Sequence, residues 1–134
     1  MKTSTIDYLG DLRTRATHLR SGEQFITDAP PDNKGKGAAF SPTDLLATSL
    51  GTCAVTIMGI AAREHGFDLT GIRIEITKVM ESNPRRVGEV IVEFNFSNKD
   101  YSEKEKTIIK KAAYSCPVYQ SLHPDLKKTY VFNF

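Results

Sequence analysis

Apolar positions follow two different periods along this chain, and the change between them predicts the elements. Isoleucines alternate with polar residues over 72–77, and valines and phenylalanines alternate with mostly polar residues over 90–96. This two-residue period indicates two half-buried strands, and the segment "MESNPRR" between them predicts a turn. Over 46–64 the apolar residues instead recur every three or four positions, which predicts a helix.

The predicted helix over 42–64 has clear start and stop signals. Ser41 is a good N-cap, Pro42 suits the first helical position, and Asp44 gives an acidic variant of the capping box. Gly66 is a plausible C′ residue. Because the helix is apolar on most sides, we expect it to be central, covered by a sheet and by another helix or a second subunit. Its polar residues argue against a membrane span.

The remaining patterns complete an α+β domain. Two extended arms flank a turn at Ser21–Gly22, and a capping box at Ser102 and Glu105 opens a second helix that Pro117 interrupts or restarts. The final "TYVFNF" reads as a short strand. The order β-β-α-β-β-α-β predicts one domain over 1–134, with two long helices packed on a mainly antiparallel sheet.

Composition and charge argue against some classes of function. The chain has 134 residues, of which 40% are hydrophobic, and its net charge is +2 with scattered basic residues, which argues against nucleic-acid binding. No apolar leader is evident, so we expect a cytoplasmic protein with reduced thiols. In that compartment its two cysteines are chemically active or inert rather than a structural disulfide.

The two cysteines differ in context. Cys53 lies in the apolar "SLGTCAVTIMGIAARE", about three turns into the helix, where periodicity alone favours a packing role. The helix dipole is too far away to make it a thiolate, so a reactive Cys53 requires a nearby cation. Cys116 precedes Pro117 at or next to the N-cap of a short helix, a position that favours a thiolate, although the residues alone favour a cysteine that ends a helix against the core. If the thiols meet, one could attack a substrate and the other form the disulfide.

Other catalytic or metal-binding patterns are weak. His18, His65 and His123 show no metal-ligand spacing with the cysteines, so we expect no metal site. The "SLGTC" segment lacks the nucleophile elbow of serine hydrolases.

Together, "FSPTDLLATSLGTC" and the downstream "AAYSCPVYQSL" resemble the OsmC/Ohr family of thiol-dependent hydroperoxide reductases. In order, the resemblance covers residues from about Tyr8 to Phe134, and the N-terminal segment looks closest to the OsmC-like, YhfA-type subgroup. The resemblance implies an intertwined homodimer in which both subunits contribute to each active site. It further implies a peroxidatic Cys53, a resolving Cys116, a thiol or lipoyl-type reductant that resets the pair, and no organic cofactor.

The resemblance also assigns an arginine to the thiolate. The matching residue is Arg13, with Arg15 as the alternate, and a solvated strand arginine is the other interpretation. The Ohr and OsmC branches carry a glutamate where this chain has Thr43, and the next residue is Asp44. Asp44 either caps the helix, pairs with the arginine, or does both.

Two other functions remain open at this point. A non-enzymatic protein could keep this fold and bind a small apolar ligand at the dimer interface, and the Thr43 departure motivates that alternative. A redox sensor is the third, although nothing in the sequence indicates its partner. If the chain is a peroxidase, the apolar residues around Cys53 favour organic hydroperoxides over hydrogen peroxide. These residues are Leu50 and Ile57, with Phe40, Met58 and Tyr119 as further candidates.

Overall fold

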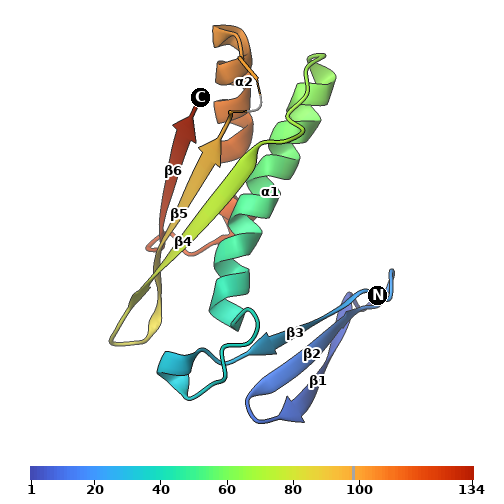
Figure 1. The fold of residues 1–134 in the computed structure, drawn as a ribbon, viewed down its shortest axis with the longest axis vertical. Helices are drawn as coiled ribbons and strands as arrows, with labels where there is room; N and C mark the ends of the chain where they lie inside the picture. The colour runs from blue at the N-terminus through green and yellow to red at the C-terminus, as the bar shows by residue number, and fades with distance from the viewer. Residues whose placement is uncertain (98) are drawn as a thin grey trace. The chain divides into compact units, whose positions relative to one another are not determined.

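The computed structural model describes residues 1–97 and 99–134, which form two compact units, Met1–Leu46 and Ala47–Phe134. Figure 1 labels the helices and strands along the chain. The helix α1 (Pro42–Glu64) runs through the boundary between the two units.

The N-terminal unit is built on a three-stranded antiparallel sheet in the order β1-β2-β3. Its strands are β1 (Ser4–Gly10), β2 (Arg13–His18) and β3 (Gln24–Asp28), and the short 3-10 helix η1 (Pro31–Asn33) follows. The turn predicted near Ser21–Gly22 joins β2 to β3, but the sequence interpretation missed β1. The β1–β2 turn places Leu12 at a φ of 62°. The turn carries a typical signal, Gly10 and Asp11 with φ of 80° and 52°, but the sequence interpretation took this segment as part of one extended arm.

The two faces of this N-terminal sheet differ in chemistry. Ile6 pairs with Ala16, which pairs with Phe25, so these three side chains share one face. On that face Ile6 is 68% exposed, Tyr8 67% and Phe25 51%. We call the residues Ile6, Tyr8, Ala16 and Phe25 the apolar face of the N-terminal sheet. The opposite face carries the charged residues of β2.

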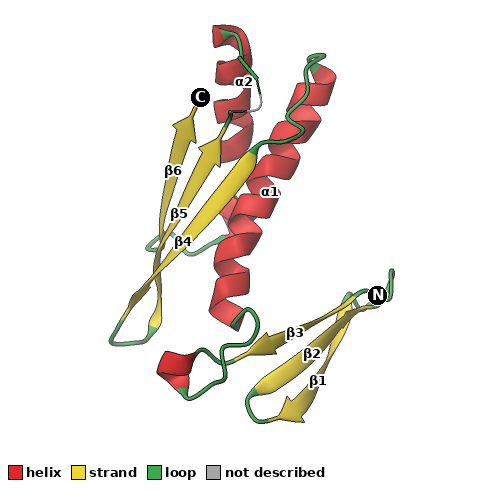
Figure 2. Ribbon diagram, in the orientation of Figure 1, coloured by secondary structure: helices red, strands yellow, loops and turns green. Residues whose placement is uncertain are grey.

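The C-terminal unit contains a second three-stranded sheet, in the order β4-β5-β6. The strands β4 (Arg73–Glu81) and β5 (Arg86–Asn95) form the predicted antiparallel hairpin. The last strand, β6 (Lys127–Asn133), is parallel to β5. The helices α2 (Glu103–Tyr114) and α3 (Pro117–Ser121) lie between these two strands in sequence and supply the crossover that a parallel pair needs. The predicted α+β class with a mainly antiparallel arrangement is confirmed, as the distribution of helix and strand in Figure 2 shows.

The predicted helix ends are confirmed at atomic detail. The Ser41 hydroxyl accepts from the Asp44 N–H at 3.1 Å, and the Asp44 carboxylate accepts from the Ser41 N–H at 3.0 Å. Ser102 and Glu105 form the same reciprocal pair at the start of α2. Gly66 follows α1 with a φ of +77°, as expected of a C′ glycine.

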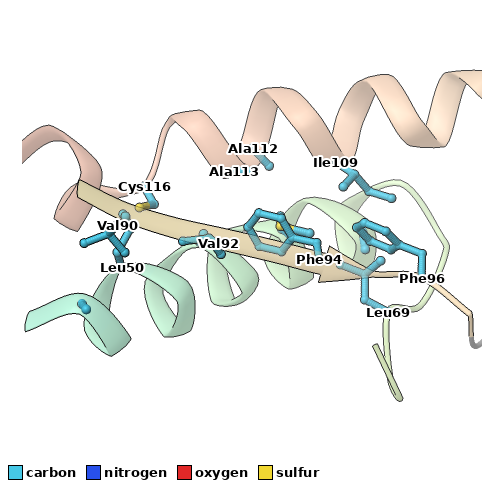
Figure 3. Packing of buried hydrophobic residues seen from close by; sticks show 14 of the residues in the cluster. Leu50, Leu69, Val90, Val92, Phe94, Phe96, Ile109, Ala112, Ala113 and Cys116 are labelled. Atoms are coloured by element: carbon cyan, nitrogen blue, oxygen red, sulfur yellow. The ribbon is translucent and has the colours of Figure 1, made fainter. Parts of the chain in front are cut away.

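The hydrophobic core of the C-terminal unit lies between its helices and one face of β5. Figure 3 shows Val90, Val92 and Phe94 in line along β5 and Phe96 just after its end, with buried residues of α2 above and of α1 below the strand in this view. Gly51 allows α1 to come close to β4, because a Cβ at this position would lie 2.5 Å from the Ile76 Cδ1. By length and composition alone α1 could cross a membrane, but core helices meet the same criterion. Its residues Leu50, Ala54, Met58 and Ala62 are buried in this core.

Candidate functional site

The two cysteines of the chain meet in the C-terminal unit. Cys53 lies in the middle of α1 and is partly exposed, whereas Cys116 lies directly before α3 and is fully buried. Both are free thiols, and they lie close enough together for Cys53 to raise the pKa of Cys116. Segments that are distant in sequence therefore place two thiols side by side.

Cys116 is held by groups from two further elements. It is the N-cap residue of α3, where its sulfur accepts a hydrogen bond from the Tyr119 N–H at 3.3 Å. The prediction that Pro117 starts a new short helix is thereby confirmed. The hydroxyl of Tyr130, on β6, lies 3.9 Å from the same sulfur. Sequence analysis missed Tyr130, because its place beside Cys116 depends on the parallel pairing of β6 with β5.

The electrostatics of Cys116 favour the protonated thiol. Burial raises the pKa of Cys116 above its ordinary value, and the Cys53 thiol raises it further. The hydrogen bonds from the Tyr119 N–H and from Tyr130 act in the opposite direction and lower the pKa. The partly exposed Cys53 is consequently the thiol that a solute reaches first, and Cys116 is a buried, protonated neighbour.

The apolar residues predicted to surround Cys53 differ in burial and in the unit to which they belong. Leu50 and Met58 are fully buried in the core, and Cys53, Ile57 and Tyr119 are partly buried and pack against it. Phe40 belongs to the N-terminal unit, where it is 52% exposed.

In the N-terminal unit, Arg13 forms a two-pronged ion pair with Asp28. The Arg13 Nε donates to Asp28 Oδ1 at 2.7 Å, and the Nη2 donates to Oδ2 at 2.9 Å. The Asp28 side chain is 2% exposed and also accepts from the Ala38 N–H at 3.0 Å. The hydrogen bonds and charge of Arg13, opposed by burial, lower the pKa of Asp28, and Asp28 in turn raises the pKa of Arg13. The pair fixes the guanidinium plane and leaves further N–H groups for another acceptor.

Asp28 is a residue that sequence analysis missed. Arg13 and Asp28 face each other across the antiparallel β2–β3 pair. The sequence did contain a signal for this pair, namely the predicted turn near Ser21–Gly22. Pairing the two strands residue by residue outward from that turn places Arg13 opposite Asp28. The alternate arginine, Arg15, makes only a 3.4 Å surface pair with Asp7.

Asp44 and Thr43 lie in the first turn of α1. Asp44 performs the capping role that was one of its two predicted roles. The Thr43 hydroxyl lies 3.2 Å from that of Ser41. The carboxylate observed to orient Arg13 is therefore Asp28, at the end of β3.

A groove of about 910 Å³ lies elsewhere on the C-terminal unit, along the second half of α1. Its lining includes Val55, Ile60, Phe67 and Ile72, with Arg63 and Lys99 as cations. Neither cysteine lines it. Among the described residues, no group of three or more His, Cys, Asp or Glu side chains is placed to hold a metal ion.

Comparison with known proteins identifies the family. Residues 35–130 match the model of the family described as OsmC-like protein. The chain belongs to the OsmC-like family. The match covers α1, both cysteines and most of the C-terminal unit, and it does not distinguish branches within the family. No curated protein matches the sequence.

Solved structures of the OsmC-like fold agree with this assignment. A protein of Psychrobacter arcticus, named for osmotic stress induction and a detoxification response, is 50% identical with a TM-score of 0.95. The match covers 99% of this chain and 96% of that one. A Legionella pneumophila organic hydroperoxide resistance protein, OsmC, is 13% identical (TM-score 0.77, covering 100% and 98%). A Vibrio cholerae protein named for organic hydroperoxide resistance, with captopril in one active site, is 14% identical (TM-score 0.74, covering 99% and 92%). The last two likenesses concern the fold alone.

Proposed function

We propose that this OsmC-like protein is a thiol-dependent peroxidase that reduces organic hydroperoxides, and hydrogen peroxide as a poorer substrate, in oxidative stress defence. The observation that carries the proposal is the pairing of a partly exposed Cys53 with a buried Cys116 whose thiols interact. A second thiol within reach of the first is what a two-cysteine reduction requires.

The exposure of each thiol supports the role that we propose for it. The Cys53 thiolate attacks one oxygen of the O–O bond, which breaks and leaves Cys53 as a sulfenic acid, while the other oxygen departs as an alkoxide and takes a proton to become an alcohol. The Cys116 sulfur then attacks the Cys53 sulfur, and the sulfenic oxygen leaves as water after taking the Cys116 proton. A dithiol reductant, such as a lipoyl group, reduces the resulting disulfide and is itself oxidised to a disulfide.

Arg13 is the cation proposed for the Cys53 thiolate, with Asp28 as its positioning residue. Family resemblance suggests Arg13, and the buried Asp28 carboxylate supports it by fixing two guanidinium N–H groups. The remaining N–H groups would serve the sulfur and a peroxide oxygen. In this proposal Asp28 takes over the orienting work of the family glutamate, while Asp44 caps the helix.

The protein is proposed to work as a homodimer in the cytoplasm, with no cofactor and no nucleic-acid or membrane partner. The apolar face of the N-terminal sheet supports the dimer, since Ile6, Tyr8 and Phe25 are largely exposed in one copy. OsmC-family proteins are typically homodimers.

Peroxide consumption tests the proposal directly. Purified protein should consume tert-butyl and cumene hydroperoxide in the presence of a dithiol reductant, and Cys53→Ser should abolish this activity. Cys116→Ser is the matched control, expected to allow one attack on peroxide but no intramolecular disulfide. Equal rates for wild type and Cys53→Ser would refute the proposal.

The groove along α1 favours one second candidate, a non-enzymatic protein that binds a small apolar ligand. Its lining is mostly apolar, and its two cations, Arg63 and Lys99, could bind an acidic head group of such a ligand. Native mass spectrometry that finds a bound ligand, together with unreacted cysteines and no peroxide turnover, would support this candidate over the peroxidase.

A further inference from the structure

The surroundings of Cys116 contain a hydroxyl that the proposed reaction has not used. Three groups from three different elements surround the sulfur: the Cys53 thiol of α1, the Tyr119 N–H of α3 and the Tyr130 hydroxyl of β6. Of these, only the Tyr130 hydroxyl is a side-chain donor that can be removed without removing a thiol or breaking a helix cap.

Aromatic packing fixes the position of the Tyr130 ring. Its centroid lies 5.3 Å from that of Phe94 in an edge-to-face contact, 5.0 Å from Tyr114 and 5.5 Å from Tyr119. Tyr130 pairs with Val92 in the parallel β5–β6 register, which places it on the same side of the sheet as the core. A ring held on several sides directs its hydroxyl to one place, and that place is beside the Cys116 sulfur.

Tyr130 remains a proton donor at neutral pH. Burial raises the pKa of Tyr130 well above its ordinary value, and the nearby Cys116 thiol raises it further. A neutral phenol can donate its O–H to a sulfur that is losing its own proton. The buried Cys116 needs such a donor, because the apolar core otherwise disfavours the developing thiolate.

We propose that Tyr130 is a positioning residue for Cys116, and that its hydroxyl donates a hydrogen bond to the Cys116 sulfur while that sulfur forms or leaves the disulfide with Cys53. In disulfide formation the S–O bond of the Cys53 sulfenic acid breaks, the S–S bond forms, and the Cys116 proton leaves with the oxygen as water. In reduction by a dithiol, the reductant's sulfur attacks Cys53 and Cys116 departs as a thiolate, which accepts the hydrogen bond from Tyr130 until it takes a proton. The redox step rests on the proposed function, whereas the hydrogen bond itself does not.

Few other titratable groups bear on this pair. Cys53 from α1 and Tyr119 from α3 act on both Cys116 and Tyr130. Tyr114 from α2 packs on the Tyr130 ring, and the Lys128 Nζ lies 5.2 Å from the Tyr119 ring centroid. The β5 residues beneath the ring, Val92 and Phe94, carry no charge.

Tyr130→Phe tests the proposal because it keeps the ring and removes only the hydroxyl. The first readout is the pKa of Cys116 in a Cys53→Ser background. It is measured by NMR titration, from the chemical shift of the isotopically labelled cysteine β-carbon. We expect Tyr130→Phe to raise the Cys116 pKa by up to about one unit, equivalent to about a tenfold smaller thiolate fraction. Tyr114→Phe is the matched control, since it removes a neighbouring hydroxyl from the same ring cluster, and it should leave the Cys116 pKa unchanged.

The second readout is the rate at which diamide, a thiol oxidant, closes the Cys53–Cys116 disulfide in the otherwise wild-type protein. This rate should fall about threefold in Tyr130→Phe and not in Tyr114→Phe, because part of the lost thiolate is compensated by the higher nucleophilicity of a more basic sulfur. Neither readout needs a hydroperoxide, so absence of peroxidase turnover would overturn the proposed function without touching this inference. An unchanged Cys116 pKa in folded Tyr130→Phe protein, or an equal change in Tyr114→Phe, would overturn the inference.

Discussion

The two units of this chain treat their apolar side chains in opposite ways. In Ala47–Phe134 the large apolar residues converge on β5, where Val90, Val92 and Phe94 have no exposed surface. In Met1–Leu46, described throughout, the only buried residues are Thr27, Asp28 and Ser41. One unit thus has a core of its own, and the other holds a buried carboxylate inside a sheet whose apolar face is open. We therefore expect the apolar face of the N-terminal sheet to be covered by a second copy in the proposed dimer.

Replacing a phenylalanine by alanine in each unit tests whether the two units bury their apolar residues in these different ways. Phe94→Ala should destabilise the protein by about 3–5 kcal/mol at any protein concentration, because it leaves a cavity in the core. Phe25→Ala should lower the free energy of unfolding only where the dimer forms, because Phe25 is exposed in a single copy. The loss should therefore grow with protein concentration. Chemical denaturation at several concentrations measures both, and a concentration-independent loss for Phe25→Ala would contradict the proposed cover.

A charge on the apolar face tests the dimer itself. Ile6→Asp should weaken self-association at least about tenfold, because it puts an unpaired carboxylate into the buried interface. Thr5→Asp is the matched control, one residue away on the opposite face of β1. Sedimentation analysis gives the dissociation constants. Equal constants for the two variants would mean that this face is not the interface.

The buried carboxylate of the N-terminal unit should matter for activity. Asp28→Asn keeps the shape of the side chain but removes the charge that orients Arg13, and we expect hydroperoxide reduction to fall about tenfold. Asp44→Asn should act chiefly through the α1 cap and so reduce stability more than turnover. A larger loss of turnover in Asp44→Asn than in Asp28→Asn would mean that Asp44, and not Asp28, orients Arg13.

The same pair predicts a pH dependence of stability. Because Arg13 lowers the pKa of Asp28, the pair stabilises the folded state above the ordinary aspartate pKa, and this contribution is lost as the pH falls through the lowered value. The stability difference between wild type and Asp28→Asn should therefore be constant near neutral pH and shrink in acid. Denaturation midpoints across that range measure it, and a difference that grows in acid would contradict the assigned partner.

The smallest expected effect concerns a helix start in the C-terminal unit. Ser102→Ala removes the α2 cap and should cost about 1 kcal/mol. Glu105→Gln is the control, since glutamine completes a capping box as glutamate does, and it should be nearly neutral. Similar losses for the two variants would show that the charge of Glu105, rather than the cap geometry, stabilises the helix.

The sequence predicted the features that depend on neighbouring residues and missed those that depend on long-range interactions. The caps at Ser41 and Ser102, the strand pair β4–β5 and the restart at Pro117 depend on neighbouring residues, and all were predictable. The family resemblance selected Cys53 and Cys116, but their meeting depends on how α1 and α3 pack. The Arg13–Asp28 pair depends on the β2–β3 register, and the place of Tyr130 depends on a parallel pairing that no local pattern encodes.

The proposed reaction requires that Cys53 reacts with hydroperoxide and that Cys116 resolves the product within the same subunit. One equivalent of cumene hydroperoxide added to the reduced protein, followed by intact mass and peptide mapping, tests it most directly. We expect an intramolecular Cys53–Cys116 disulfide in the wild type and a sulfenic acid on Cys53 in Cys116→Ser. Two reduced cysteines after exposure to the hydroperoxide, or a disulfide linking two subunits, would contradict it.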